Sequence, residues 1–531
     1  MRVSSFRWSV LLVLAAIAPA TAIAEEISYL NDVMAVLSKA GCNQGICHGN
    51  KFGKGGFRLS LRGQDPGFDY DVLTRDLFAR RVNSQHPSES LLLLKPTMQV
   101  AHEGGRRFDV DSVEYKILLA WLEANMPRET EPARQLTGLK VSPPEQILFG
   151  EATQIQLQVE AEFSDGAKRD VTRLAVYDPV KQIVEVTANG LVQRQQFGET
   201  WVNVRYLDQQ QAVRVAFIAE RPNYRWSGAA PRNAIDEHVF ARLKQLRLNP
   251  GPLCTYDIFV RRTYLDLLGL LPTSMYARRF LSEQHDDKRT RLIDQLLERQ
   301  EFADYWALKW SDLLRNEEKT LDRKGVTNFH AWIRRAFARN MPMDQFVREL
   351  IEARGSTYEN PPANYYRALR DPLTRAESTA QLFLGIRLQC AKCHNHPFDR
   401  WTQDDYYGWA NLFAQVNYKT VNNTRKDRLD KNEFIGEQIV YMTSQGNVKH
   451  AVTNRPAPSR FLGDSEQSID ENDDRLLQLS AWIASPENRQ FARAQVNRIW
   501  YQLIGRGIVD PIDDFRITNP PSNSELLEAL T

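Results

Sequence analysis

The pentapeptide Cys390-Ala391-Lys392-Cys393-His394 matches C-x-x-C-H, the attachment pattern for haem c. Two cysteines three residues apart lie on one side of a helical turn, so both thiols can form thioethers with the vinyl groups of one porphyrin. The histidine that follows is held beneath the ring, where its imidazole can ligate iron. The competing interpretations are a redox dithiol, a plain disulfide and half of a zinc site. Zinc would need two further Cys or His ligands, and only His396 is close.

A second cysteine pair precedes a histidine near the N-terminus, with a different spacing. Four residues separate Cys42 from Cys47, and His48 follows directly. Five residues of α-helix turn through about 500°, so a regular helix would point the two sulfurs to different faces. Gly45 could supply the local turn that brings them back together. The spacing alone leaves haem attachment and a local disulfide equally open.

The first 24 residues have the features of a secretory signal peptide. Arg2 and Arg7 supply positive charge, residues 8–20 are apolar, and Ala22-Ile23-Ala24 is a small-x-small cleavage site. The apolar run is shorter than the ~20 residues that a membrane-spanning helix needs. We therefore expect a periplasmic or otherwise extracytoplasmic protein that is not integral to the membrane after cleavage. Attachment of haem c also takes place outside the cytoplasm.

The composition is that of an ordinary globular protein. The 531 residues include 68 Lys and Arg and 66 Asp and Glu, which gives a formal net charge of +2. No run of five like charges occurs, so the sequence indicates neither a nucleic-acid partner nor a polybasic membrane patch. Five cysteines are few for an exported domain stapled by disulfides.

The residues around Cys42 predict a small helical haem domain over residues 25–130. Apolar positions at helical spacing indicate one helix before the motif and another over residues 113–122, and small cytochromes c pack two such helices across the haem. The loop between them offers two sixth ligands for the iron. Met98 would raise the reduction potential, whereas His102 would give a bis-histidine site of lower potential. We favour His102, because its loop is polar and rich in glycine.

The remaining chain changes from strand to helix patterns. Residues 137–220 alternate apolar and polar side chains between regularly spaced turns, which predicts an Ig-like β-sandwich. The pattern is helical over residues 232–425, where a predicted helix over Ala376–Gln389 runs directly into Cys390. A second helical domain is predicted over residues 470–531, and the sequence ends inside a helix, as if this domain were cut short.

These patterns predict a multidomain α and β protein. Its parts are a small all-α cytochrome c-like domain, an Ig-like β-sandwich and a large, mostly α-helical region. If a haem is attached at Cys390 and Cys393, its iron needs a second ligand opposite His394. The sequence offers candidates for this ligand by elimination only. They are His330, Met343 and His450.

Several stretches resemble a family of large exported proteins of planctomycetes. The run AGCNQGICHGNK at residues 40–51 is similar to the family's N-terminal cytochrome domain, and CAKCHNHPFD at residues 390–399 is the most specific mark. The resemblance continues through FARAQVNRIWYQLIGRGIVDP at residues 491–511. Members resemble one another in having a signal peptide, a planctomycete-type cytochrome c domain, a bacterial Ig-like domain and two helical domains of unassigned function. The resemblance implies haem c binding and electron transfer, and it supplies no reaction.

We therefore expect an exported, c-type cytochrome-like protein that carries one or two covalent haem c groups and exchanges electrons with redox partner proteins. One alternative is a haem-dependent oxidoreductase acting on an extracytoplasmic substrate, for instance an extracellular polymer bound through the Ig-like domain. Another is a cell-surface structural protein with disulfides. No catalytic residue is assigned. The predicted haem-binding residues are Cys42, Cys47, His48, Cys390, Cys393 and His394, with His102 or Met98 as a further iron ligand.

Overall fold

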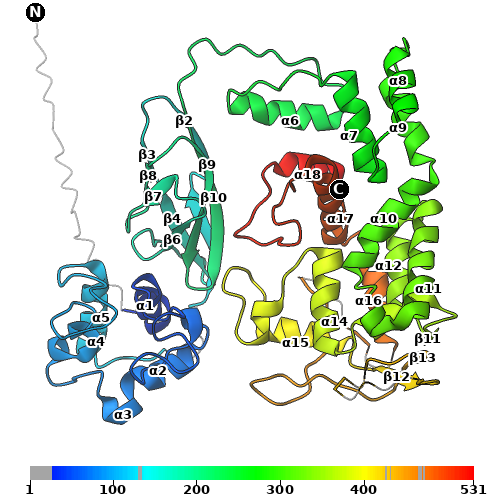
Figure 1. The fold of residues 1–531 in the computed structure, drawn as a ribbon. Helices are drawn as coiled ribbons and strands as arrows, with labels where there is room; N and C mark the ends of the chain where they lie inside the picture. Colours follow the sequence, from blue (N-terminus) through cyan, green and yellow to red (C-terminus); the bar gives the residue numbers. More distant parts are fainter. Residues whose placement is uncertain are drawn as a thin grey trace, which may run out of the picture. The chain divides into compact units, whose positions relative to one another are not determined.

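The computed structural model describes residues 27–129, 134–424, 427, 429–430, 432–463, 469–470 and 473–531. The predicted signal peptide lies outside them. The chain divides into two compact units, Met1–Ala133 and Arg134–Thr531. The first is helical, and the second begins with strands and continues as a mostly helical region (Figure 1). The predicted fold class is confirmed. In the described part of the chain, no helix combines the length and the apolar character needed to cross a membrane.

The first unit is built on the two helices that the sequence predicts. A π-helical turn, η1 (Tyr29–Val33), continues into α1 (Met34–Lys39), and α5 (Val113–Glu123) packs against them. The rings of Tyr29 and Trp121 stack with centroids 5.6 Å apart and fix this crossing. The shorter elements between them are η2 (Leu61–Gly63), α2 (Pro66–Thr74), α3 (Asp76–Ala79), η3 (Pro87–Glu89) and α4 (Leu91–Leu94).

The second unit begins with strands where the sequence alternates. Residues 155, 157, 159, 161 and 163 are all buried, because side chains two apart in a strand share one face. The strands pair in the orders β1-β4-β5, β2-β10-β9-β6 and β3-β8-β7. Their bounds are β1 Leu136–Ser142, β2 Glu145–Phe149, β3 Gln154–Gln156, β4 Gln158–Phe163, β5 Lys168–Asp170, β6 Val176–Pro179, β7 Val184–Val186, β8 Leu191–Arg194, β9 Gly198–Tyr206 and β10 Gln209–Ile218.

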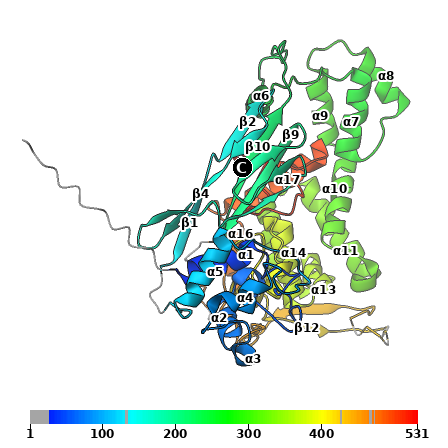
Figure 2. The ribbon, with the colours of Figure 1, turned by 90° about the vertical axis from the view of Figure 1, so that its left-hand side faces the viewer.

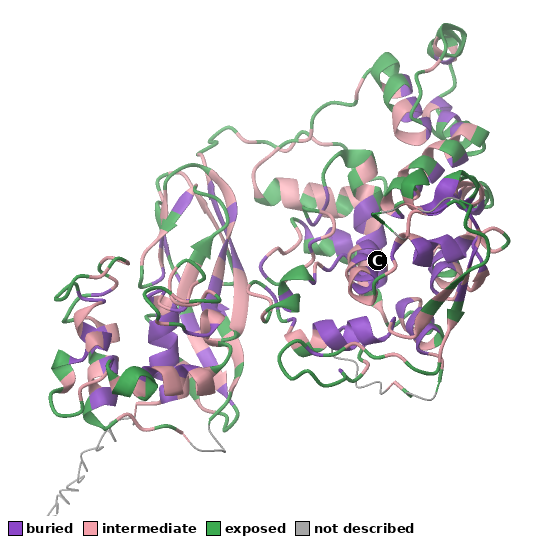
Figure 3. Cartoon of the chain, turned by 60° about the horizontal axis from the view of Figure 1, so that its bottom comes forward, coloured by how far each residue is buried: buried purple, intermediate pink, exposed green. Residues whose placement is uncertain are grey.

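The helical region surrounds one large core rich in aromatic residues. Phe329, Trp332 and Phe346 stack within it, and Figure 3 shows buried residues concentrated in its interior. Helix α10 packs against both α7 and α11 (Figure 2). The helices are α6 Ala234–Gln245, α7 Tyr256–Leu268, α8 Ser274–Ser282, α9 Lys288–Leu297, α10 Gln300–Leu313, α11 Glu318–Ala338, α12 Met343–Ile351, α13 Asn364–Ala368, α14 Pro372–Thr379, α15 Gln403–Asn411, α16 Arg475–Ile483, α17 Arg489–Ile504 and α18 Ser524–Leu530. A small sheet adds β11 Gly355–Ser356, β12 Val416–Thr420 and β13 Gln438–Met442.

The helix predicted to run into Cys390 ends earlier, so this prediction is wrong at its C-terminal end. Helix α14 continues as the π-helical η5 (Ala380–Leu384), which stops at Gly385 with φ +66°. Phe515 donates its backbone N–H to the Gly385 carbonyl, and a Cβ on Gly385 would lie 2.7 Å from the Phe515 ring. This close contact and the left-handed backbone require glycine. The cysteine motif lies instead on a separate 3₁₀ turn, η6 (Gln389–Lys392).

A buried ion pair holds the helical region together. Asp322 interrupts α11 with φ +57°, and its carboxylate accepts hydrogen bonds from Tyr358 Oη at 2.7 Å and from the backbone N–H of Gly436 at 3.1 Å. Arg367, whose side chain is 0% exposed, lies 3.3 Å from the same carboxylate and also donates to the Gly436 carbonyl. Burial alone would raise the pKa of Asp322, but the hydrogen bond from Tyr358 and the others lower it below its usual value.

We expect Asp322→Asn to lower the stability of the helical region by about 3 kcal/mol, because the substitution leaves the buried Arg367 cation without its carboxylate. Urea unfolding followed by circular dichroism measures this loss. A lowered pKa stabilises the fold above the usual pKa of Asp and loses that contribution as the pH falls. The difference between wild type and variant should therefore shrink below about pH 4. Exposed Asp294→Asn is the control, and an equal effect of both substitutions would contradict the role of Asp322.

Candidate functional site

A cavity of about 530 Å³ in the first unit collects four of the predicted haem-binding residues. Cys42, Cys47 and His48 line it from the loop after α1, and His102 lines it from the loop before α5. Leu37 and Phe57 contribute to its apolar wall. Residues more than fifty positions apart in the sequence thus line one cavity.

The chain from Cys42 to His48 forms a loop and not a helix, so the spacing of the two cysteines does not point their thiols to different faces. Helix α1 ends at Lys39, and the His48 N–H then donates to the Cys42 carbonyl at 3.0 Å, which closes the loop. Gly45, which the sequence offers as the turn residue, lies within this loop, but its backbone does not require glycine. Gly41 has the positive φ, +75°, and Gly49 allows the close approach, since a Cβ there would lie 2.1 Å from the Asn43 carbonyl oxygen. Both cysteines consequently reach one cavity, and both are free thiols in the structure.

The two histidines are held in the same way. His48 Nδ1 lies 3.0 Å from the Phe57 carbonyl oxygen, and His102 Nδ1 lies 2.9 Å from the Gly105 carbonyl oxygen. A carbonyl can only accept a hydrogen bond, so in each neutral ring Nδ1 carries the proton and Nε2 carries the lone pair. A metal-ligating histidine usually has this arrangement.

The spacing of these rings fits one metal ion between them. Their centroids are 6.4 Å apart, and their planes differ by 18°. With metal–nitrogen bonds of about 2 Å, two imidazoles on opposite sides of an ion have centroids about 6 Å apart. Two axial imidazoles, two nearby thiols and an apolar wall are the donor set and the lining that a covalent haem requires. The residues present therefore fit the group.

Met98 does not take part in this arrangement. It is not among the residues that line the cavity, its side chain is 43% exposed, and its backbone has φ +62°. The interpretation of Met98 as an iron ligand is therefore not supported, and His102 is the residue opposite His48. The chain turns at Met98, four residues after the apolar run 91–94 ends, and leaves this residue exposed.

Burial sets the protonation of the cavity groups. It lowers the pKa of His48, although the Phe57 carbonyl opposes the shift, so the ring is neutral near pH 7, which is the form that ligates metals. Burial also raises the pKa of the Cys42 thiol to about 12, with the Arg107 guanidinium opposing it. Arg107 contacts the other cysteine too, since its Nη2 lies 3.3 Å from Cys47 Sγ.

The second motif lies on an exposed turn. Cys390 and Cys393 are both exposed free thiols on or beside η6. Tyr407, from α15, donates its hydroxyl to the Lys392 carbonyl at 2.8 Å and so ties this turn to the helical core. The aromatic residues after the motif, Tyr407 among them, favour helical core in the sequence, and Tyr407 is buried in that core; its contact with the motif turn was not predicted.

Hydrogen bonds separate the histidines near this motif into two kinds. His394 Nδ1 lies 2.8 Å from the Asn395 carbonyl oxygen, which leaves Nε2 with the lone pair. His396 Nδ1 instead accepts the Phe398 N–H, and His450 Nδ1 accepts the Val452 N–H, both at 3.2 Å. Of these three residues, only His394 has the hydrogen-bonding pattern found in His48 and His102. Of the other candidates, Met343 lines a different cavity and His330 lies half-buried on α11.

No group of three or more His, Cys, Asp or Glu side chains that could hold a metal ion occurs among the residues that the structure describes.

Family models match two segments of the chain, both in the helical part of the second unit. Residues 234–418 are similar to PSCyt2, a protein of unknown function (DUF1549), and residues 475–531 are similar to PSD1, a protein of unknown function (DUF1553). By name these are planctomycete-type, cytochrome-associated domains. The motif at Cys390 falls inside the first match, and the cavity of the first unit falls outside both. No curated protein matches the chain.

We expect Gly49→Ala to disrupt the first cavity and Gly45→Ala to leave it intact. The added methyl group at residue 49 meets a carbonyl oxygen at 2.1 Å, whereas at residue 45 its nearest neighbour is Leu61 at an ordinary 3.8 Å. Overpacking of this kind costs about 1–3 kcal/mol. Thermal unfolding of the full chain measures both effects. Equal behaviour of the two variants would contradict this description of the loop.

Proposed function

We propose that this protein is an exported c-type cytochrome that binds haem c covalently in its first unit and transfers electrons outside the cytoplasm. The observation that carries the proposal is the pair of near-parallel imidazoles, His48 and His102, with Nδ1 of each engaged by a backbone carbonyl. Cys42 and Cys47 line the same cavity and would supply the two thioethers.

Each residue of this site has a distinct task. His48 and His102 would hold the iron from opposite faces, and the Phe57 and Gly105 carbonyls keep their rings in the required tautomer. Bound haem supplies one-electron redox chemistry. If both histidines bind the iron, no position on it would remain for a substrate, which favours a carrier that passes electrons to redox partner proteins over a catalyst at this site.

A second haem at Cys390, Cys393 and His394 is part of the proposal. His394 has its Nδ1 on a carbonyl, whereas His396 and His450 accept backbone N–H groups at Nδ1. An iron held by His394 would therefore have neither of these neighbours as a ready second ligand. This difference supports a second candidate function, a haem-dependent oxidoreductase in which the open side of that haem meets a substrate.

The proposal is tested by producing the mature chain in a periplasm equipped for cytochrome c maturation. A pyridine haemochrome spectrum and an intact mass should both report two covalent haem groups per chain. Replacing Cys390 and Cys393 by Ser should remove one of them and leave the haem of the first unit. A colourless protein whose mass has fallen by the hydrogens of disulfide bonds would contradict the proposal and favour the structural alternative.

We expect His102→Ala, made in the chain that lacks Cys390 and Cys393, to bind carbon monoxide in its reduced form, whereas the parent does not. Carbon monoxide needs an open position on the iron, and removal of His102 creates one. Met98→Ala, in the same loop, is the matched control and should behave like the parent. Carbon monoxide binding by Met98→Ala but not by His102→Ala would show that Met98 is the ligand.

A further inference from the structure

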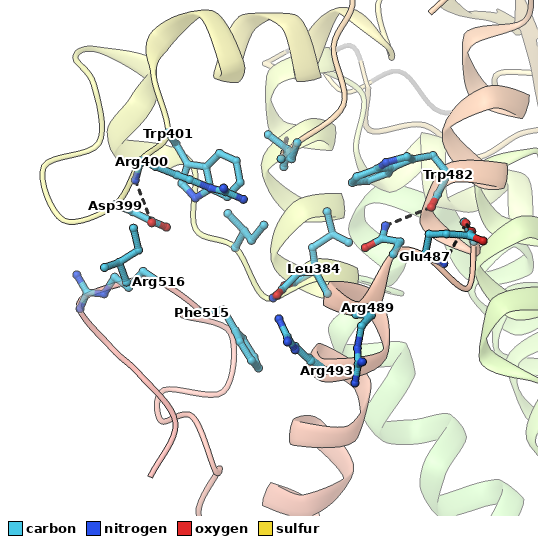
Figure 4. Close-up of a pocket in the computed structure, with 17 residues that line it drawn as sticks. Leu384, Asp399, Arg400, Trp401, Trp482, Glu487, Arg489, Arg493, Phe515 and Arg516 are labelled. Carbon is cyan, nitrogen blue, oxygen red and sulfur yellow. Dashed lines mark hydrogen bonds between the residues drawn. The ribbon is translucent and has the colours of Figure 1, made fainter. Parts of the chain in front are cut away.

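A cavity of about 620 Å³ in the helical region has no part in the proposed electron transfer. Segments that are distant in sequence form it, among them residues 399–401, the start of α17 and residues 515–517 (Figure 4). The first segment belongs to the loop that begins at His394, and the His396 N–H closes this loop by donating to the Trp401 carbonyl at 2.7 Å. The cavity wall is thus continuous with the second cysteine motif.

Positive charge gathers at the start of α17. Arg489 and Arg493 lie one turn apart there and both line the cavity (Figure 4). The dipole of a helix favours negative charge at its N-terminus, so two cations in this position are unfavourable unless an anion faces them. Glu528 of α18 supplies one carboxylate, 3.0 Å from Arg489 Nη2 and 2.6 Å from Arg493 Nη2. One carboxylate shared by two guanidinium groups leaves a positive charge over.

The other charged groups around the cavity do not add to this local excess, so the excess positive charge is confined to the start of α17. Arg400 and Arg516 bring the lining arginines to four, against the two acids Asp399 and Glu487. Asp514 pairs with Arg516 at 3.2 Å. Burial raises the pKa of Asp399, although several hydrogen bonds oppose the shift.

Two of these arginines also have unused donors. Among the described residues, the Nε–H groups of Arg493 and Arg516 are buried with no hydrogen-bond partner. Buried donors of this kind cost free energy unless an acceptor reaches them. An oxyanion in the cavity offers several acceptor oxygens, and a guanidinium group matches carboxylate or sulfate geometry.

The remaining wall is apolar and rigid. Trp401 and Trp482 line it together with Phe515, and the Trp482 ring is fixed by stacking on Phe461, with centroids 5.0 Å apart and planes 5° apart. Cavities of about 300–1,000 Å³ hold organic molecules, so the space exceeds the need of an inorganic ion. Flat aromatic walls suit the face of a sugar or aromatic ring.

We propose that this cavity binds a small organic anion, whose carboxylate or sulfate group contacts Arg489 and Arg493 and whose ring lies against Trp401 and Trp482. The binding itself does not depend on haem. If the second haem is present, the anion is held on the loop that carries His394, the ligand of the haem iron. The anion would then be the class of substrate for the oxidoreductase alternative.

Calorimetric titration of the full chain tests this site with five probes: galacturonate, glucose 6-sulfate, benzoate, potassium sulfate and neutral galactose. We expect binding of at least one ring-bearing anion, binding of inorganic sulfate at least about tenfold weaker, and no binding of galactose. The sugar and benzoate arms identify which kind of ring the walls accept. No binding of any organic anion, or equal binding of inorganic sulfate, overturns the proposal.

Substitutions then locate the binding. Arg493→Gln should weaken it at least about tenfold, because a charge-assisted hydrogen bond is lost, and Arg323→Gln, an exposed control on α11, should leave it unchanged. Glu528→Gln removes the competing carboxylate and should tighten binding, which a purely structural role of this cluster would not do. Unchanged or weaker binding in Glu528→Gln overturns the proposal even where Arg493→Gln fails to fold.

These titrations are repeated on the chain in which Cys390 and Cys393 are replaced by serine. Retained binding there shows that the cavity works without the second haem. Failure of the anion site therefore leaves the haem proposal untouched, and a colourless protein leaves the anion site untouched.

Discussion

The two hydrogen bonds from His48 and His102 to backbone carbonyls are the constraint on which the first site depends. An imidazole can turn about two side-chain bonds and can carry its proton on either nitrogen. It presents Nε2 as a ligand only when the proton is on Nδ1 and the ring is turned toward the ion. The Phe57 and Gly105 carbonyls select that combination in both rings. The loop closed between Cys42 and His48 then sets the distance between the rings, and the packing of α5 on α1 holds the unit that encloses them.

The cysteine motif that matches the haem c pattern better has the less suitable surroundings for a haem. C-x-x-C-H at residues 390–394 is the regular pattern, but its thiols are exposed and its nearest histidines accept hydrogen bonds at Nδ1. The irregular motif at Cys42 lies against a cavity with an opposing histidine. A motif reports the chemistry of a few neighbouring residues, whereas a cofactor site also needs a wall and a second ligand from elsewhere in the chain.

Local periodicity was enough to predict most elements, and long-range contacts account for the errors. Helices α1 and α5 and the strand faces follow from apolar spacing alone. The end of η5 at Gly385 depends on Phe515, more than a hundred residues away, and the need for glycine at residue 49 depends on a carbonyl brought close by the loop. The organic-anion cavity is the extreme case. Segments far apart in the sequence form it, and no local pattern in the sequence marks its arginines as neighbours.

The central claim is that one iron is held between His48 and His102, and near-infrared magnetic circular dichroism of the oxidised protein tests it most directly. The chain without Cys390 and Cys393 should be used, so that the signal comes from the first unit alone. We expect the charge-transfer band of low-spin iron with two imidazole ligands. The band of histidine–methionine ligation, or a high-spin spectrum, would contradict it.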